Sequence, residues 1–146
     1  MSRTVKIALW VVVALIVGFG LIQLVPYGRD HTNPPVTSEP SWDSAQTKAL
    51  AQKACFDCHS NETVWPGYSS VAPGSWLIYR DVVKGRSRMN FSEWPAVGGG
   101  GLMARAAQKV AQGKMPPLRY RLAHSGARLT DAEKQQLIAG FKASAQ

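Results

Sequence analysis

The chain begins with an almost unbroken run of apolar residues. From Ile7 to Val25 the run holds 19 residues, of which only Gln23 is clearly polar. At about 1.5 Å of rise per helical residue, it nearly matches the roughly 30 Å hydrocarbon core of a bilayer. A secretory signal peptide is the alternative, but its apolar region is shorter, about 7–15 residues, and ends in a small-residue cleavage pattern that residues 24–29 lack. The pattern favours an uncleaved transmembrane helix, with residues 1–26 as a membrane anchor.

Positive charges flank this run unequally. Arg3, Lys6 and the amino terminus precede it, whereas Arg29 follows it beside Asp30. Because positive residues stay on the cytoplasmic side, the N-terminus is expected in the cytoplasm. The rest of the chain is then expected on the periplasmic side of a bacterial cytoplasmic membrane, attached through a single span.

A proline-rich segment follows. Prolines resist helix and favour extended backbone, so residues 27–42 are predicted to form a stiff linker. It either serves as a spacer or lies packed across the surface of the following domain, residues 43–146. The prolines of the linker are Pro34, Pro35 and Pro40, and Pro26 comes directly before it.

Beyond residue 43 the apolar positions recur at helical spacings. The expected helices run from a cap at Ser41 or Asp43 to about Ala54, from Pro73 or Gly74 to Lys84, from Leu102 to Gln112, and onwards from a capping box at Thr130 and Glu133. Gly85 and Gly113 are interpreted as the stops of the second and third helices. No strand pattern is convincing, so the predicted fold class is all-α.

Composition limits the architecture and the partners. A chain of 146 residues can hold one compact domain. It carries 17 Lys and Arg against 9 Asp and Glu, a net charge of +8, which favours partners with acidic docking surfaces. Helix-turn-helix, zinc-finger and aromatic RNA-binding signatures are missing from the sequence, so nucleic acid is not an expected partner.

The chemistry is concentrated in Cys55-Phe56-Asp57-Cys58-His59, a C-x-x-C-H motif that holds both cysteines of the chain. Two thiols at this spacing reach the two vinyl groups of one porphyrin as thioethers, and the adjacent imidazole reaches the iron. A thioredoxin-like dithiol is expected within a βαβ pattern, and a zinc site needs more ligands than His31 and His124 supply. The motif predicts one covalently attached haem c, with His59 as the proximal ligand.

The iron needs a sixth ligand. Met115 is the first candidate, because Pro116 and Pro117 fix the backbone of a loop that follows a helix. Met89 and His124 remain alternatives, and Met115 itself could instead fill a gap in the core. Met1 is excluded by topology, and Met103, early in a helix, is expected in the core.

Aromatic and arginine residues surround the motif in sequence. Large rings between residues 60 and 94 would exclude water from a porphyrin or simply build a core. Arginines in the same region suit haem propionates, although any one of them could be a solvated charge. The rings are Trp65, Tyr68, Trp76, Tyr79, Phe91 and Trp94, and the arginines are Arg80, Arg86 and Arg88.

The residues also carry a family resemblance. The segment from Cys55 to Ser69, then Ala72-Pro73, Ser75-Trp76, Gly85-Arg86, residues 90–94, and Met115-Pro116-Pro117 with Tyr120, resembles the bacterial haem-binding domain family of c-type cytochromes. The resemblance covers nearly all of the chain after Arg29. It implies a class I cytochrome c-like fold, attachment through Cys55 and Cys58, and ligation by His59 and Met115. Gly67 departs from the pattern, since a second tryptophan is common there, but no ligand is affected.

A histidine–methionine iron is saturated, which favours one-electron transfer over the binding of small substrates. The expected function is therefore that of a membrane-anchored electron carrier without catalytic chemistry of its own, either alone or as a subunit of a larger respiratory or photosynthetic complex. A haem sensor or haem enzyme with a labile distal ligand is the first alternative. An assembly protein, in which the anchor matters more than redox activity, is the second.

Overall fold

The computed structural model describes residues 1–145, so Gln146, the last residue of the expected domain, lies outside it. Over these residues the regular elements are all helices, and a single parallel bridge joins Ser38 to Glu93. The all-α prediction is confirmed. The chain forms two compact units, which we call the N-terminal unit, residues 1–32 with 65–81, and the core unit, residues 33–64 with 82–145.

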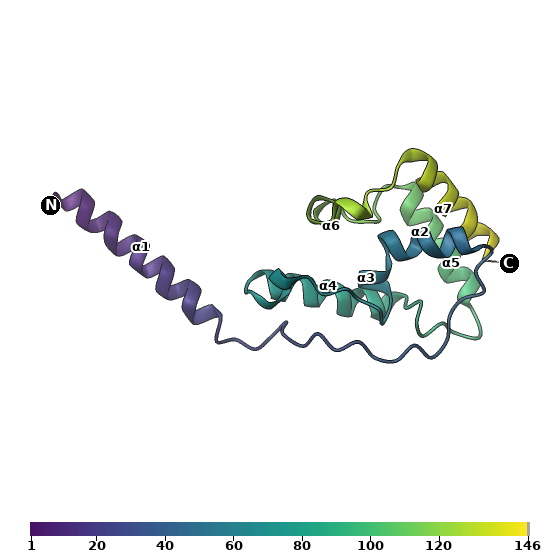
Figure 1. Ribbon diagram of the computed structural model, residues 1–146, viewed down its shortest axis with the longest axis horizontal. Helices are drawn as coiled ribbons and strands as arrows, with labels where there is room; N and C mark the ends of the chain where they lie inside the picture. The colour runs from purple at the N-terminus through teal and green to yellow at the C-terminus, as the bar shows by residue number, and fades with distance from the viewer. Residues whose placement is uncertain (146) are drawn as a thin grey trace. The chain divides into compact units, whose positions relative to one another are not determined.

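Figure 1 shows the order of the helices along the chain, and the boundary between the units falls inside α4. The α-helices are α1 (Arg3–Ile22), α2 (Ala45–Ala54), α3 (Phe56–His59), α4 (Gly74–Arg88), α5 (Gly99–Ala111), α6 (Leu118–Ala123) and α7 (Asp131–Ala143). Two short 3₁₀ helices, Gly67–Ser70 and Ser125–Ala127, lie between them.

Helix α1 coincides with the apolar run at the start of the chain. The Ser2 side chain caps it by accepting a hydrogen bond from the Val5 amide at 3.3 Å, and none of its residues is buried. The helix is long and apolar enough to cross a membrane, and a signal sequence has the same properties. The predicted N-terminal apolar helix is confirmed.

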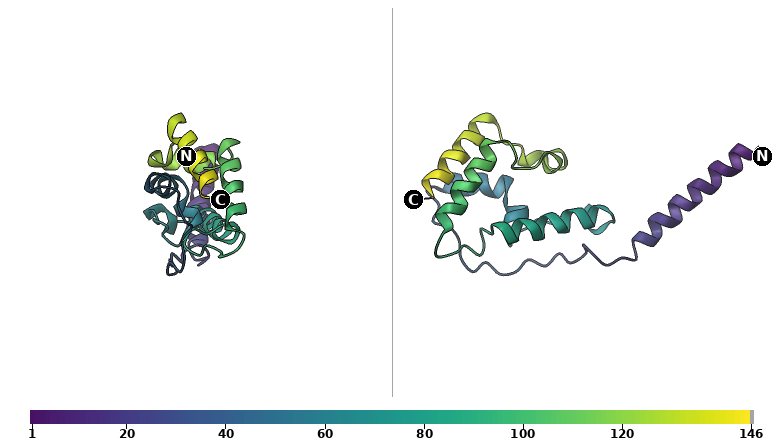
Figure 2. Two further views of the ribbon diagram at one scale, coloured as in Figure 1. Left: turned by 90° about the vertical axis from the view of Figure 1, so that its right-hand side faces the viewer. Right: turned by 180° about the vertical axis from the view of Figure 1, so that it is seen from behind.

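The core unit is held together by α2, α5 and α7. Helix α7 packs against both α5 and α2, as the views in Figures 1 and 2 agree. Phe91, Met103, Leu137 and Phe141 are at most 1% exposed and fill the space between the helices. Met103 is therefore a core residue, as the sequence predicted.

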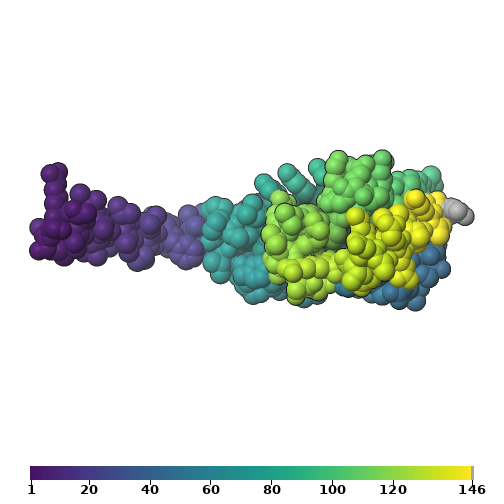
Figure 3. Space-filling model, turned by 90° about the horizontal axis from the view of Figure 1, so that it is seen from above, coloured from purple at the N-terminus to yellow at the C-terminus, as the bar shows by residue number. Residues whose placement is uncertain are grey.

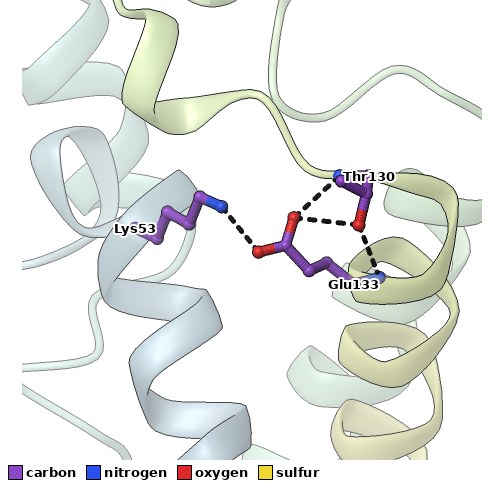
Figure 4. Close-up of polar contacts among 3 residues, drawn as sticks. All are labelled: Lys53, Thr130 and Glu133. Carbon is purple, nitrogen blue, oxygen red and sulfur yellow. Dashed lines mark hydrogen bonds and ion pairs between the residues drawn. The ribbon is translucent and has the colours of Figure 1, made fainter.

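Two features hold α2 and α7 close together. A Cβ atom at Gly140 would overlap the Thr47 hydroxyl, so the glycine permits a near approach of the two helices. At the other end, Lys53 of α2 forms a 2.6 Å ion pair with Glu133 of α7 (Figure 4). Glu133 also completes the expected capping box with Thr130, which is confirmed.

Three helix boundaries differ from those expected. The cap of α2 is Ser44, whose hydroxyl accepts from the Thr47 amide, rather than Ser41 or Asp43. Helix α4 continues through Gly85 to Arg88, because Gly85 provides space for a neighbouring segment instead of a stop. Helix α5 begins at Gly99, since its first glycines are drawn into helix after Gly98 turns the chain with φ of 83°.

Part of the expected linker lies against the core unit. The Asn33 side chain donates to the Thr63 carbonyl at 2.9 Å, and the Thr37 amide donates to the Ser92 carbonyl at 2.9 Å. The Trp94 amide then donates to Ser38 at 3.2 Å. Side-chain and backbone hydrogen bonds thus fix residues 33–38, which are not a free spacer.

Candidate functional site

The C-x-x-C-H motif begins where α2 ends. Cys55 is the C-cap of α2 and the N-cap of α3, so one residue redirects the chain between the two helices. Its amide donates to the Ala51 carbonyl at 2.8 Å, and its own carbonyl accepts from the His59 amide at 2.9 Å. With Phe56 buried in the core, this short helical turn sets the positions of the thiols and the imidazole together.

Segment 89–91 fixes His59 at both its ring and its backbone. Nδ1 lies 3.0 Å from the Met89 carbonyl, and the His59 carbonyl accepts from the Phe91 amide at 2.7 Å. Burial lowers the pKa of His59, an effect partly offset by the bond to Met89. The ring is therefore neutral, with its proton on Nδ1 and the lone pair of Nε2 available to a metal, as in proximal ligands generally.

Helix α4 passes directly beside the motif. A Cβ atom at Gly85 would overlap the Cys58 carbonyl, so only glycine allows this approach. The next residue, Arg86, donates from Nε to the Ser60 carbonyl at 2.8 Å and from its guanidinium to Thr63 at 2.9 Å. Arg86 thus orders the chain that leaves the motif.

A buried polar cluster continues this attachment, and sequence reasoning missed it. The Asn61 amide donates to the Ser92 hydroxyl at 2.9 Å, and the Asn61 side chain donates to Glu93 at 2.8 Å. Asn90 in turn donates to the Asn61 side chain at 2.9 Å. Because every one of these hydrogen bonds joins residues 60–63 to residues 90–93, the cluster holds segment 89–91 against His59.

A cavity of about 390 Å³ opens beside the motif, within the size range of small-molecule and cofactor sites. The expected site residues Cys55, His59 and Met115 all line it. The other lining residues are Arg88, Met89, Leu102, Arg105, Ala106, Lys109, Val110 and Phe141.

The backbone after α5 carries Met115 to this cavity. Gly113 adopts a φ of 68°, and the amides of Lys114 and Met115 both donate to the Lys109 carbonyl, at 3.0 and 3.3 Å. Met115 is half-buried against the core. The loop is thus folded back onto the last turn of α5, and its thioether shares a cavity with His59.

A hydrogen bond that sequence reasoning missed joins α6, the helix that follows the loop of Met115, to the motif. Tyr120 on α6 donates its hydroxyl proton to Asp57 Oδ2 at 2.6 Å, while Asp57 Oδ1 accepts from the Val64 amide at 3.0 Å. Burial and the Asp57 carboxylate raise the pKa of Tyr120 well above its usual range, so the phenol remains a donor. Tyr120 was noticed only as part of the family resemblance, and nothing in the spacing paired it with Asp57.

The other candidates for ligation occupy different positions. Met89 lines the cavity, but its carbonyl binds Nδ1 of His59. His124 stacks on the Tyr120 ring with centroids 4.3 Å apart. His31 stacks on Trp65, with centroids 4.5 Å apart, in the N-terminal unit.

Of the three arginines considered for haem propionates, Arg88 lines the cavity. Arg80 lies 3.9 Å from Asp81 in the N-terminal unit. Two cations that sequence reasoning missed, Arg105 and Lys109, also line the cavity from α5. Their spacing of four residues on one helix face was the available signal.

Neither thiol forms a disulfide, and the environment of Cys55 differs from that of a redox dithiol. Burial, with a further contribution from Cys58, raises the pKa of Cys55 to about 12. Reactive dithiols show the opposite shift, since the thiolate is the nucleophile. Within residues 1–145, no group of three or more His, Cys, Asp or Glu side chains is placed to hold a metal ion.

The donor set fits a haem. A neutral imidazole, a thioether and an adjacent thiol line one cavity, whose other side chains are largely apolar, and the imidazole proton is held by a carbonyl.

Searches among curated proteins and solved structures give no match. The sequence profile of the haem-binding domain family, in contrast, matches residues 17–143, which is most of the chain. On this match the chain belongs to the haem-binding domain family, as the motif and its neighbours indicated.

Proposed function

We propose that the chain is a membrane-anchored, monohaem c-type cytochrome that carries single electrons on the periplasmic side of the bacterial membrane. The observation that carries the proposal is the placement of His59 and Met115 on one cavity beside the C-x-x-C motif. Haem c, when bound, supplies a one-electron iron couple, and paired histidine and methionine ligands favour electron transfer over substrate binding. The chain itself binds, orients and shields the group, and we assign it no bond-making chemistry.

Covalent attachment would use Cys55 and Cys58. Neither thiol is in a disulfide, and both lie on the turn that also carries His59. Thioether formation consumes the thiols, and the raised pKa of Cys55 does not oppose a bond made once during maturation. Attachment next to the ligand would keep the orientation of the porphyrin relative to His59 constant.

Met115 is the better of the two methionine candidates for the distal position. A second ligand would have to come from a segment other than the one that fixes His59. The Met89 carbonyl is 3.0 Å from His59 Nδ1, so Met89 belongs to the segment that would orient the first ligand. Met115 reaches the cavity from the separate loop after α5, and it therefore suits the role of the second ligand.

Retention of α1 as an anchor is supported by the contacts at its C-terminal end. The Gln23 side chain accepts from the Ala72 amide at 2.9 Å and donates to the Ala72 carbonyl at 3.0 Å. A cleaved leader has no need of such a pairing with the mature chain. The family match also begins at residue 17, inside the helix.

The cations of the cavity suggest how partners would dock. Arg88, Arg105 and Lys109 are exposed, and no salt bridge within the part of the chain that the structure describes involves them. Two propionates would neutralise part of this charge and leave a positive rim. A redox partner with an acidic surface suits such a rim, and its association would weaken as salt rises.

Two spectra test the proposal. Denatured wild-type protein should retain its haem, whereas Cys55→Ser with Cys58→Ser should release it. The ferric wild type should show the weak far-red band of methionine ligation, and Met115→Ala should lose it while the matched variant Met89→Leu keeps it. Carbon monoxide binding by the untouched ferrous protein would instead support the sensor or enzyme, because it requires an open sixth site.

A further inference from the structure

Residues 65–81, which we call the 65–81 block, have an unusual composition for a water-facing surface. Charged residues make up 18% of the whole chain, yet residues 65–79 contain none. The block's two charges, Arg80 and Asp81, lie together at its end, 3.9 Å apart. Three of its apolar or aromatic side chains are about half exposed: Tyr68 (48%), Val71 (46%) and Leu77 (52%).

The 65–81 block is attached to the chain that leaves α1. The two hydrogen bonds between Gln23 and the Ala72 backbone, at 2.9 and 3.0 Å, form the first attachment. Gln23 is the one clearly polar residue of the apolar run, and this pairing explains its presence there. Ala72 is 1% exposed and Gln23 is half-buried, so the pair is partly shielded from water.

Three further contacts extend this attachment over residues 27–31. Gly28 has a φ of 80°, and a Cβ there would lie 2.6 Å from the Ser75 carbonyl oxygen. Tyr27 meets Tyr79 edge to face with ring centroids 5.3 Å apart. The His31 ring lies 3.2 Å from the Ser69 carbonyl oxygen.

The attachment keeps the 65–81 block at one end of α1. In Figure 3 the atoms of this block meet those at the end of the helix. Beside them, Leu24 (77%), Val25 (41%) and Tyr27 (49%) are also exposed, so the apolar surface runs from the helix end onto the block. Trp and Tyr are the residues enriched where a membrane-spanning helix leaves the hydrocarbon, and the block contains two of each.

We propose that the 65–81 block is a membrane-contacting surface, in which Tyr68, Val71 and Leu77 enter the interfacial layer of the bilayer that α1 spans. The inference rests on the proposed membrane anchor. Its occupant is lipid, because the exposed apolar surface is continuous with the anchor and lacks the charges that a water-facing or acidic partner surface would require. The 65–81 block would thus hold the chain at the membrane surface, in addition to the anchor α1.

Photo-crosslinking of the full chain tests this contact. The photoreactive residue p-benzoylphenylalanine replaces Val71 or Leu77 in haem-loaded protein, reconstituted into nanodiscs of phosphatidylethanolamine and phosphatidylglycerol. Matched positions are Leu15 on α1, 68% exposed, and Val97 of the core unit, 90% exposed. Each variant is checked for an unchanged haem spectrum, and lipid adducts are measured by mass spectrometry.

We expect lipid adducts at Leu15, Val71 and Leu77, several-fold more abundant than at Val97. Adducts at Leu15 without adducts at Val71 and Leu77 would overturn the inference while leaving the anchor intact. The lack of adducts at Leu15 would refute the anchor and the inference together. Crosslinks from Val71 to a copurified protein in place of lipid would overturn the inference in favour of a protein partner. Equal adducts at Val97 would overturn it as well, because the 65–81 block would then contact lipid no more than the core unit does.

Discussion

The two units of this protein use apolar side chains in opposite ways. In the core unit, Phe91, Leu137 and Phe141 are at most 1% exposed, and the helices that carry them pack on one another. In the N-terminal unit, α1 buries none of its residues, and apolar side chains such as Leu15 and Leu77 are more than half exposed. Similar residues therefore face protein in one unit and the surroundings in the other.

This difference shows that burial, rather than composition, distinguishes the folded core from the exposed apolar surface of the N-terminal unit. Large exposed apolar patches on a protein mark contact sites, because water does not solvate them favourably. The core unit owes its stability to packing between its own helices. The N-terminal unit, in the proposed function, obtains the equivalent free energy from the bilayer.

The largest effect is expected where the core unit has no spare volume. Gly85→Leu would place a side chain where the Cys58 carbonyl lies, and both partners belong to rigid helical turns. Overpacking of this severity exceeds the usual cost of ~1–3 kcal/mol, so we expect little folded, haem-loaded protein. The yield is measured by haem absorbance per purified chain.

Gly101→Ala is the matched control, since a Cβ at Gly101 meets nothing within 4 Å and the residue lies in α5. It should keep full haem loading and gain up to ~1 kcal/mol of helix stability. Normal loading of Gly85→Leu would show that α4 does not need its close approach to the motif.

The next prediction compares one kind of truncation in the two units. Phe141→Ala empties a site that is 1% exposed, which should lower the free energy of unfolding by ~3–5 kcal/mol. Leu15→Ala removes a side chain that is 68% exposed and should leave the unfolding of the core unit unchanged. Denaturant titration in detergent, followed by the haem absorbance, measures both variants. Equal losses in the free energy of unfolding for Phe141→Ala and Leu15→Ala would contradict the distinction between the units.

Periodicity and short motifs predicted the parts that local chemistry determines. The apolar run produced α1, and Thr130 with Glu133 produced the capping box that begins α7. The residues Cys55, His59 and Met115 were expected at one site from a motif and a proline-flanked methionine, and the structure places them on one cavity.

Features that depend on contacts distant in sequence could not be predicted in this way. Gly85 has the local signature of a helix stop, and only the position of Cys58, 27 residues earlier (85 − 58), makes it an interior residue of α4. The hydrogen bond between Asp57 and Tyr120 spans 63 residues. The Gln23 side chain appeared as an interruption of an apolar run, because its partner Ala72 lies 49 residues away.

A smaller effect is expected from the hydrogen bond between Tyr120 of α6 and Asp57 of the motif. Tyr120→Phe removes the donor to Asp57 and keeps the ring that stacks on His124. A hydrogen bond to a carboxylate contributes ~1.5–3 kcal/mol, and the half-buried position favours the lower end. The far-red ferric band should disappear at a lower denaturant concentration than in wild type.

Tyr27→Phe is the matched control in the N-terminal unit, because it also removes only a hydroxyl and leaves the ring pair with Tyr79. It should not change the band. If Tyr120→Phe behaves in the same way, the bond to Asp57 has no part in holding Met115.

The smallest effect is expected at the ion pair between α2 and α7. Hydrogen bonds from Lys53 and from Thr130 lower the pKa of Glu133 from 4.5 to about 2. A lowered pKa means that the folded state prefers the carboxylate, so the stabilisation is complete above pH 4.5 and is lost as the pH falls towards 2.

Glu133→Gln keeps an oxygen for the Thr130 amide and removes the charge. The variant should be slightly less stable than wild type near pH 6, by a small amount because the pair is exposed, and the difference should vanish towards pH 2. Asp131→Asn, in the same first turn of α7, is the control for the helix dipole. A difference that persists at low pH, or an equal one in Asp131→Asn, would assign the effect to the helix terminus and not to the contact between Lys53 and Glu133.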